Sequence, residues 1–337
     1  MPTATEHIPE QIELIKTLER KGYTYATADG IYFDTSKLKH YGRLAQLHVS
    51  GLQAGKRVAA GAKRSKTDFA LWKFSARPGE RQQEWPSPWG VGYPGWHIEC
   101  SAMAMKYLGA SFDIHTGGQD HIPIHHTNEI AQSEAATGKP YVKYWLHGAF
   151  LNFKGEKVSK SKGGLYTVTE LEQLGYSAMH LRYLYLLTHY RKPLNFTLEH
   201  LTAARAAYER LKRKAQDLQG SGKGKPLPYK LAFERAINND LNMPEALQAL
   251  WKMLDSPLAS ADKLKLIKLA DTVLGLQLLN QSKEDIPASI YALAHERQKQ
   301  RQAKDWGGAD TSRALLFEKG YNVEDTPSGQ KISKRSI

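Results

Sequence analysis

The stretch that decides the fold runs from Gly95 to Gln132 and contains two chemically dense segments. These read GWHIECSAM over 95–103 and DIHTGGQDHIPIHHTNEIAQ over 113–132. Aromatic residues, histidines and glycines are concentrated here, as they are at the ligand-binding end of an open α/β sheet. We therefore expect the ligand end of an α/β domain in this part of the chain.

Three residues of this stretch form a candidate metal site. His125 and Glu129 are four residues apart, so on a helix they share one face. Cys100 is the only cysteine of the chain, and its thiolate would complete a three-ligand zinc set with the imidazole and the carboxylate. Spacing alone leaves two other interpretations open, a buried cysteine that packs as a small hydrophobe and a surface His–Glu pair.

A cationic loop follows further along the chain. Residues 153–164 read FKGEKVSKSKGG, with four lysines, two serines and three glycines. A mobile loop of this composition can close on a polyphosphate and neutralise the charge that develops when a phosphate is transferred. Composition alone favours the alternative, a solvated lysine-rich loop without a ligand.

The charge balance indicates a polyanionic partner. The chain has 337 residues, 47 of them basic and 34 acidic, and a formal net charge of +13. A surplus of this size favours phosphate-rich partners, because neutralising phosphates releases counterions. The alternative is a basic but otherwise ordinary soluble protein. The length is sufficient for two or three domains.

The single cysteine excludes a disulfide within the chain and is typical of a protein of the reducing cytoplasm. No apolar run approaches the roughly 18–20 residues that span a membrane. The first residues lack the basic and apolar regions of a secretory signal. We therefore expect a cytoplasmic location and no membrane partner.

Helical periodicity marks both ends of the chain. The apolar residues that recur at helical spacing near the start are Ile8, Ile12, Ile15 and Leu18. Gly22 then predicts a helix end, and Asp29-Gly30 predicts a turn between two short strands within residues 23–34. Residues 36–85 are polar and basic, and we interpret them as a small irregular insertion.

From Thr167 onward the pattern is helical. It includes a strong amphipathic helix over 201–218 and a second helical region over 229–320. Residues 220–228 (GSGKGKPLP) read as a flexible basic linker between them.

Taken together, these segments resemble the cysteinyl-tRNA synthetase family. The segments that carry the resemblance are PSPWGVGYPGWHIECSAM, DIHTGGQDHIPIHHTNEIAQ and KVSKS, in this order. KVSKS (157–161) is similar to the lysine–serine signature of class I aminoacyl-tRNA synthetases. Further similar blocks, from ATEHIPEQIELI near the start to VEDTPSG near the end, extend the resemblance over almost the whole chain.

The resemblance implies a role for each site residue. Cys100, His125 and Glu129 match three of the four zinc ligands of the family, and Trp96 lies where the family places an aromatic residue beside the bound cysteine. Lys160 matches the lysine that contacts ATP, and Lys157 would help to close the loop. The remaining ATP-binding positions of the signature are Ser159 and Ser161.

The implied activity is that of a cysteine–tRNA ligase. With zinc holding the thiolate of cysteine, the enzyme would use ATP, with Mg, to form cysteinyl-adenylate and then transfer the cysteinyl group to tRNA(Cys). Zinc binds a thiolate strongly and holds it deprotonated near neutral pH, whereas a serine hydroxyl is a harder and far less acidic ligand.

The implied architecture is an incomplete class I Rossmann-like α/β catalytic domain with a small connective insertion, followed by an α-helical stem and a helical anticodon-binding domain. In residues, we expect the tail of the first catalytic half over 1–26, the insertion over 27–93 and the second catalytic half over 94–166. The stem-contact region with its linker follows over 167–225, and the anticodon-binding domain over 226–337.

The sequence also departs from the family pattern. The histidine-containing ATP motif and the first zinc cysteine of the family have no counterpart here, so we expect a fragment that is inactive alone and is completed by an N-terminal catalytic half. Ile124 follows Pro123 where the family has a phenylalanine–proline pair. His121 and Thr127 stand where leucine and glutamate are common. These changes leave the three ligand types intact.

Two other functions remain open at this point. One is a non-catalytic tRNA-binding remnant. The other is the cysteine ligase of mycothiol synthesis, which shares the catalytic domain but lacks a tRNA-binding tail such as VEDTPSG with the basic stretch 299–304. Candidate tRNA contacts in this tail are Trp306 and the segment 330–335.

Overall fold

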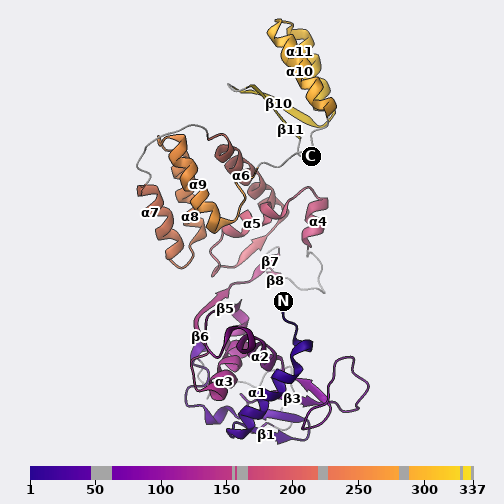
Figure 1. Ribbon diagram of the computed structural model, residues 1–337, viewed down its shortest axis with the longest axis vertical. Coiled ribbons are helices and arrows are strands. Elements are labelled where there is room, and N and C mark those ends of the chain that lie inside the picture. Colours follow the sequence, from indigo (N-terminus) through magenta and orange to yellow (C-terminus); the bar gives the residue numbers. More distant parts are fainter. Residues whose placement is uncertain are drawn as a thin grey trace. The chain divides into compact units, whose positions relative to one another are not determined.

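The computed structural model of the chain describes residues 1–46, 63–153, 156–157, 166–218, 227–280, 288–326 and 329–334 (Figure 1). The chain forms two compact units. The first contains Met1–Phe150 and Tyr190–Pro193, and the second contains Leu151–His189 and Leu194–Ile337.

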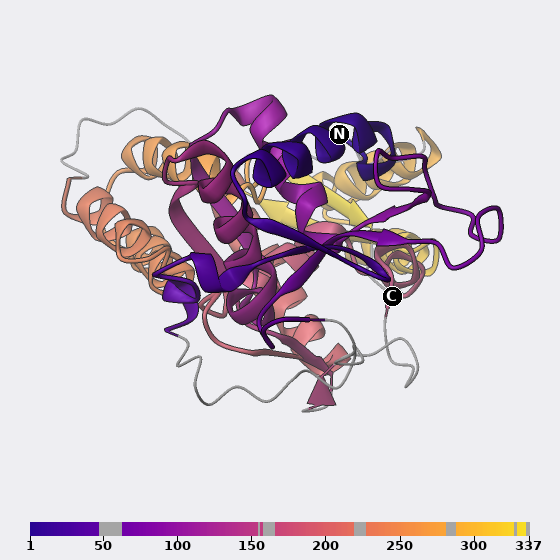
Figure 2. The same ribbon diagram turned by 90° about the horizontal axis from the view of Figure 1, so that it is seen from below.

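The first unit opens with a helix and a four-stranded antiparallel sheet. These elements are α1 (Ile8–Arg20), β1 (Thr24–Thr27), β2 (Gly30–Phe33), β3 (Phe69–Phe74) and β4 (Gly92–Pro94), and the strands lie in the order β1-β2-β3-β4. Ile15 and Leu18 of α1 pack with Phe33, Leu71 and Trp72 of the sheet in one buried cluster. Figures 1 and 2 both show helix and sheet side by side.

The helix and the two short strands predicted for the first 34 residues are confirmed, but the turn between the strands differs by one residue from the predicted Asp29-Gly30. Gly22 follows α1 with φ +74°, in the left-handed conformation that glycine adopts readily. Thr27 pairs with Gly30, so the turn consists of Ala28 and Asp29 and Gly30 belongs to β2. A Cβ at Gly30 would lie 2.2 Å from the Trp72 carbonyl oxygen, so glycine is needed there for the approach of β3.

The irregular structure predicted for residues 36–85 is wrong for Phe69–Phe74. This segment is β3, and it pairs with both β2 and β4. Phe69, Leu71 and Trp72 are buried in the core of the unit. Burial of these side chains, rather than the polar composition around them, decides the local structure.

The second part of the first unit is a βαβ arrangement that carries the candidate site. Its elements are α2 (Trp96–Leu108), β5 (Phe112–Gly118), the turn η5 (Gln119–His121), the π-helical turn η6 (Ile122–His126), α3 (Thr127–Thr137) and β6 (Val142–Gly148). β5 and β6 are parallel. An α-helical crossover is the usual connection between parallel neighbours.

The two faces of the β5–β6 pair have different surroundings. On one face, His115 and Trp145 contact His126 of η6, with ring centroids 4.8 and 4.7 Å from it. On the other face, the paired residues Ile114 and Tyr144 are 58% and 66% exposed. Parallel sheets are normally covered on both faces, so this apolar face is unusual.

The second unit is mainly helical, as predicted from Thr167 onward. Among the described residues between 151 and 280, a three-stranded sheet, β7 (Leu151–Phe153), β8 (Glu156–Lys157) and β9 (Leu194–Phe196), is accompanied by six helices. The helices are α4 (Val168–Gln173), α5 (Ala178–Leu186), α6 (Leu198–Gln216), α7 (Leu227–Asn238), α8 (Met243–Asp255) and α9 (Ser260–Leu274). The amphipathic helix predicted over 201–218 is α6, whose buried stripe includes Leu201, Tyr208 and Leu211.

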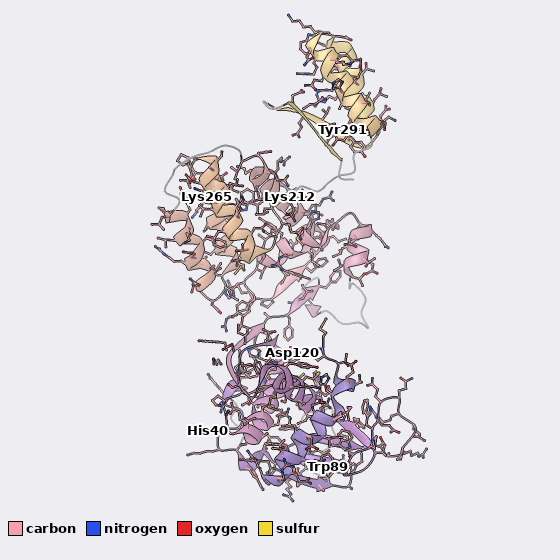
Figure 3. The ribbon with its side chains drawn as sticks, in the orientation of Figure 1. His40, Trp89, Asp120, Lys212, Lys265 and Tyr291 are labelled. Carbon is pink, nitrogen blue, oxygen red and sulfur yellow. The ribbon has the colours of Figure 1, made fainter. Side chains whose placement is uncertain are left out.

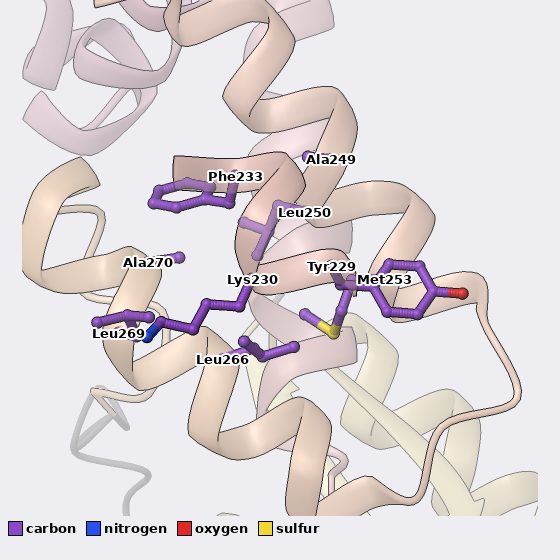
Figure 4. A pocket seen from close by; sticks show the side chains of 9 residues that line it. All are labelled: Tyr229, Lys230, Phe233, Ala249, Leu250, Met253, Leu266, Leu269 and Ala270. Atoms are coloured by element: carbon purple, nitrogen blue, oxygen red, sulfur yellow. The ribbon is translucent and has the colours of Figure 1, made fainter. Parts of the chain in front are cut away.

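A narrow apolar depression lies between α7, α8 and α9 (Figure 4). Phe233, Leu250 and Leu266 are among its lining residues, and its volume is about 10 Å³. That volume would hold at most one water molecule, so the depression is a packing feature of the three helices.

The C-terminal elements have a buried cluster of their own. They are α10 (Ala288–Gln302), α11 (Trp306–Glu318) and the hairpin of β10 (Tyr321–Thr326) and β11 (Gly329–Lys334). Leu316, Tyr321 and Val323 pack with Ile290 and Ala294. The helical region ends near Gly320 as predicted, and the hairpin after it was not predicted. In the part of the chain that the structure describes, every helix is too short or too polar to cross a membrane.

We expect Gly95→Ala to destabilise the first unit by about 1–3 kcal/mol, because the added Cβ would lie 1.9 Å from the backbone oxygen of Ala70. Gly307→Ala is the control. Gly307 is exposed in α11 with no atom within 4 Å of an added Cβ, so alanine there should stabilise by about 0.5–1 kcal/mol. Denaturant unfolding followed by circular dichroism measures both. Equal stability of Gly95→Ala and the unsubstituted chain would contradict the role of this close approach.

Candidate metal and active site

The three predicted metal ligands come from two helices of the first unit. Cys100 lies one turn into α2, which begins at Trp96 directly after the extended residue Gly95. His125 is the last but one residue of the π-helical turn η6, and Glu129 lies in the first turn of α3. π-helical turns are rare and occur often at functional sites. Here the turn delivers two consecutive buried histidines, His125 and His126.

The structure brings Cys100, His125 and Glu129 together. One ligand atom from each lies within 4.8 Å of the other two. His125 Nε2 is 2.9 Å from Glu129 Oε1, and Glu129 is fully buried. The four-residue spacing therefore produces the shared face that the sequence predicted, although part of the turn is π-helical rather than α-helical.

Glu129 has a second imidazole partner that the sequence did not assign. His115 of β5 places Nε2 at 3.2 Å from Glu129 Oε2, and the Tyr141 hydroxyl donates to the same oxygen over 3.4 Å. His115, His126 and Glu129 also lie within 4.8 Å of one another. The carboxylate thus links β5, η6 and α3.

Burial and neighbouring charges shift the pKa values of the site. Burial opposes ionisation of Glu129, but its contacts with His115 and His125 outweigh burial and lower its pKa to about 2. Burial, reinforced by the charges of Glu129 and Glu99, raises the pKa of the Cys100 thiol to about 12. In the absence of a cation the site therefore holds a carboxylate and a neutral thiol.

The residues present fit a zinc ion. Glu129 Oε1 is buried and accepts no hydrogen bond from any residue that the structure describes, although His125 Nε2 lies 2.9 Å away. Two ligand atoms that face each other in this way, without hydrogen-bond geometry, suit a shared metal ion. A cation would also compensate the repulsion between a Cys100 thiolate and the Glu129 carboxylate. Thiolate, imidazole and carboxylate are all zinc ligands.

His97 orients the metal-facing histidine. Its Nδ1 is 2.8 Å from Nδ1 of His125, so one of these two nitrogens donates to the other. Burial lowers the pKa of His97 to about 4, which leaves a neutral ring able to accept. With His125 Nδ1–H as the donor, His125 Nε2 keeps its lone pair for a metal. The sequence shows the histidine but not this contact.

A buried polar clamp joins the two helices of the site. Gln132 Nε2 donates to the His97 carbonyl oxygen over 2.5 Å and to Ser101 Oγ over 2.6 Å. Ser133 Oγ donates to Ser101 Oγ over 2.9 Å. These bonds set the position of α2, and with it Cys100, against α3. Sequence analysis missed this clamp because serine and glutamine carry no signal in one sequence.

Trp96 is 61% exposed at the start of α2. Its ring centroid lies 4.7 Å from that of His125 and 5.9 Å from that of His121, which approaches it edge-on. The Trp96 ring therefore stands beside the predicted metal ligands with much of its surface available to a small molecule. This position is compatible with the substrate pocket implied for it.

The sequence departures noted above leave the site intact. Thr127 Oγ1 donates to the Ile122 carbonyl oxygen over 2.7 Å and so satisfies an acceptor of the π-helical turn. Ile124 is 60% exposed. His121 adds a further ring to the histidine cluster, 5.0 Å from His125 and 5.2 Å from His126.

The predicted phosphate loop is described only at its start. The backbone of Lys157 belongs to β8, where it pairs with Asn152. Ser159, Lys160 and Ser161 lie outside the described residues. Their assignment stays a prediction.

We expect Gln132→Ala to lower the unfolding free energy of the first unit by about 1–3 kcal/mol, because the buried His97 carbonyl and Ser101 hydroxyl would lose their partner. Gln83→Ala, at an exposed position of the same unit, is the control and should change stability by less than about 0.5 kcal/mol. Urea unfolding of the two variants compares them. Equal midpoints would mean that the clamp does not hold α2 in place.

Known proteins match this chain over most of its length. The family model described as tRNA synthetases class I (C) catalytic domain matches residues 1–206. A protein named cysteine–tRNA ligase 1 from Burkholderia lata is 49% identical over 98% of this chain and 70% of its own length. A cysteine–tRNA ligase from Caldicellulosiruptor saccharolyticus is 41% identical over 99% of this chain and 76% of its own length.

Solved structures support the fold. The structure of Mycobacterium tuberculosis methionyl-tRNA synthetase in complex with methionyl-adenylate matches 83% of this chain and 68% of its own, with a TM-score of 0.54 and 15% identity. At this identity the likeness concerns the fold alone.

Proposed function

Because the chain belongs to the cysteine–tRNA ligase family of class I tRNA synthetases, we propose that Cys100, His125 and Glu129 hold a zinc ion that recognises the thiolate of substrate cysteine. Family membership makes the chain an enzyme that charges tRNA in an ATP-dependent reaction, with cysteine, ATP and tRNA as its partners. The observation that carries the zinc proposal is the convergence of the three side chains within 4.8 Å.

Zinc bound there would supply a Lewis acid that favours the thiolate form of a coordinated thiol. The protein groups have separate tasks. Glu129 brings a buried negative charge that anchors the cation, and His97 fixes the tautomer of His125. The exposed ring of Trp96 forms one wall for the amino acid. Serine, whose hydroxyl is harder and far less acidic, would be rejected at this site without a separate editing step.

In the proposed first step, the cysteine carboxylate oxygen attacks the α-phosphorus of ATP and the bond to pyrophosphate breaks. In the second, a terminal ribose hydroxyl of tRNA(Cys) attacks the carbonyl carbon of the adenylate, and AMP leaves. Lys157 and Lys160, with Ser159 and Ser161, would neutralise and position the phosphates of ATP and its Mg ion.

The exposed face of the β5–β6 pair supports a further part of the proposal, completion by an N-terminal catalytic half. Ile114 and Tyr144 present a paired apolar surface on a parallel sheet. A parallel sheet of two strands is stable only with its faces and edges covered. We propose that additional strands and helices of the catalytic domain, carried by a complementary segment, pack on this face and bring the remaining ATP-binding groups.

We propose three functional regions along the chain. The catalytic residues extend up to 166, a stem-contact region follows over 167–225, and an anticodon-binding region covers 226–337. We also propose a cytoplasmic location, since the Cys100 thiol must stay reduced to bind zinc. The mycothiol alternative is not favoured, because the matching relatives named cysteine–tRNA ligase extend over 98% and 99% of the chain, tail included.

We expect the purified chain to bind one zinc ion. Replacing the thiolate in Cys100→Ser should weaken zinc binding by at least about 10-fold, and His97→Ala, which removes the partner of His125, should weaken it about 10- to 100-fold. His40→Ala, at an exposed histidine outside the cluster (Figure 3), is the control. Zinc affinity from competition with a chromogenic chelator gives these values, and cobalt substitution tests the thiolate directly. A cobalt–thiolate absorption band that survives in Cys100→Ser would contradict the ligand set.

Cysteine-dependent exchange of labelled pyrophosphate into ATP tests the catalytic proposal. We expect exchange only when an N-terminal catalytic segment of a relative is added, and a loss of at least about 10-fold when Tyr144→Ser makes the docking face polar. Tyr185→Ser, at an exposed tyrosine of the second unit, is the matched control. Exchange by the chain alone would refute the need for completion. No exchange in either case, with tRNA binding retained, would favour a non-catalytic tRNA-binding protein.

A further inference from the structure

The carboxylate of Glu129 faces a second group of metal-binding side chains with the oxygen that points away from His125. Glu129 Oε1 lies 2.9 Å from His125 Nε2, whereas Glu129 Oε2 lies 3.2 Å from His115 Nε2. His126 adds a ring nitrogen, and one ligand atom each from His115, His126 and Glu129 lies within 4.8 Å of the other two. The buried carboxylate therefore stands between two candidate ligand sets, one with a thiol and one without.

The distances around Glu129 Oε2 are those of ligands that share a cation. Zinc–nitrogen and zinc–oxygen bonds are about 2.0–2.2 Å long, which places two ligand atoms of a tetrahedral site about 3.4 Å apart. The observed 3.2 Å between His115 Nε2 and Glu129 Oε2 is close to this value. The Tyr141 hydroxyl donates to the same oxygen over a long 3.4 Å, so this oxygen keeps lone-pair capacity for a cation.

Contacts with β5 and β6 hold His126 in place. Its Nδ1 lies 2.8 Å from Nε2 of His147, so one of these two nitrogens donates to the other. With His126 as the donor, its Nε2 keeps a lone pair, as the contact with His97 leaves one on His125. Gly117 of β5 makes room for the ring, because a Cβ there would lie 2.5 Å from His126 Cε1. Each ligand set thus has an imidazole that a further histidine orients.

The second ligand set suits a divalent transition metal. Glu129 and His126 are buried, and the His115 side chain is 19% exposed, which gives a cation access. Two imidazoles and one carboxylate are ligands for zinc, cobalt or nickel, whereas calcium and magnesium prefer oxygen ligands. A carboxylate can bind one ion with each oxygen, as in two-metal sites, where the ions lie about 3.5–4 Å apart.

We propose that His115, His126 and Glu129 bind a second divalent transition-metal ion, which shares the Glu129 carboxylate with the zinc site. The inference rests on the proposed function only through this shared carboxylate. Two dications on one carboxylate repel each other, so the second ion binds more weakly than the first. The purified chain then holds one ion, and the second site fills only when free metal is in excess.

Cobalt titration of the metal-free chain tests this second site. The first equivalent should give the near-ultraviolet cobalt–thiolate band of Cys100. A second equivalent, bound at least about 10-fold more weakly, should add visible absorption without increasing that band. Because both ions contact one carboxylate, the second should also alter the electron paramagnetic resonance signal of the first. A second ion that leaves this signal unchanged lies elsewhere and would overturn the proposal, as would uptake of a single equivalent.

Two ligand variants locate the second ion. His115→Ala and His126→Ala, which change different elements, should each remove the second equivalent and keep the thiolate band at saturating cobalt. That band also verifies that the first unit is folded in each variant. His40→Ala, at an exposed histidine outside the cluster, is the matched control and should keep both ions. A second equivalent that persists in both ligand variants would contradict the proposal.

Cys100→Ser separates this inference from the proposed function. The variant should lose the thiolate band and keep one ion that depends on His115. If the unsubstituted chain lacks the thiolate band but holds a His115-dependent ion, the proposed zinc site fails and the second site stands. Loss of all cobalt binding in Cys100→Ser would show that His115, His126 and Glu129 cannot hold an ion by themselves, and the inference would fall.

Discussion

The candidate site depends on one buried carboxylate. Glu129 is fully buried, and its two oxygens meet imidazoles from different elements, His115 at 3.2 Å and His125 at 2.9 Å. An unpaired charge in this position would be costly, so the fold brings His115 of β5 to one carboxylate oxygen and leaves the other oxygen facing His125 of η6. The same requirement gathers histidines around a point that Cys100 can also reach. The buried Glu129 carboxylate therefore constrains both the packing of these elements and the proposed metal site.

The polar groups around this carboxylate position the reactive ones. Gln132 and Ser101 hold α2 against α3, and His97 contacts His125. A metal site needs ligands held to within a few tenths of an ångström, and side chains that lack the support of neighbours cannot provide that accuracy. Selection of cysteine over serine would then follow from ligand chemistry, because the competing side chains have nearly the same size.

The first unit and the C-terminal elements of the second unit present different surfaces. The first unit contains the metal ligands and the exposed apolar pair Ile114 and Tyr144 on its parallel strands. The C-terminal elements have a separate small cluster and a two-bond ion pair between the buried Arg297 and Asp325. A cluster of that size gives limited stability by itself, so the ion pair and the hairpin pairing add to the stability of these elements.

The sequence by itself determined the family, the ligand types and the local elements with a strong periodic signal. The helix that ends before Gly22, the amphipathic helix α6 and the shared face of His125 and Glu129 all follow from spacing between near neighbours. Only the tertiary structure decided what depends on distant residues. It added β3 to the first sheet and brought His115 to Glu129 and His97 to His125. The physical reason is that spacing along the chain specifies which side chains share a face, whereas burial and packing specify which faces meet.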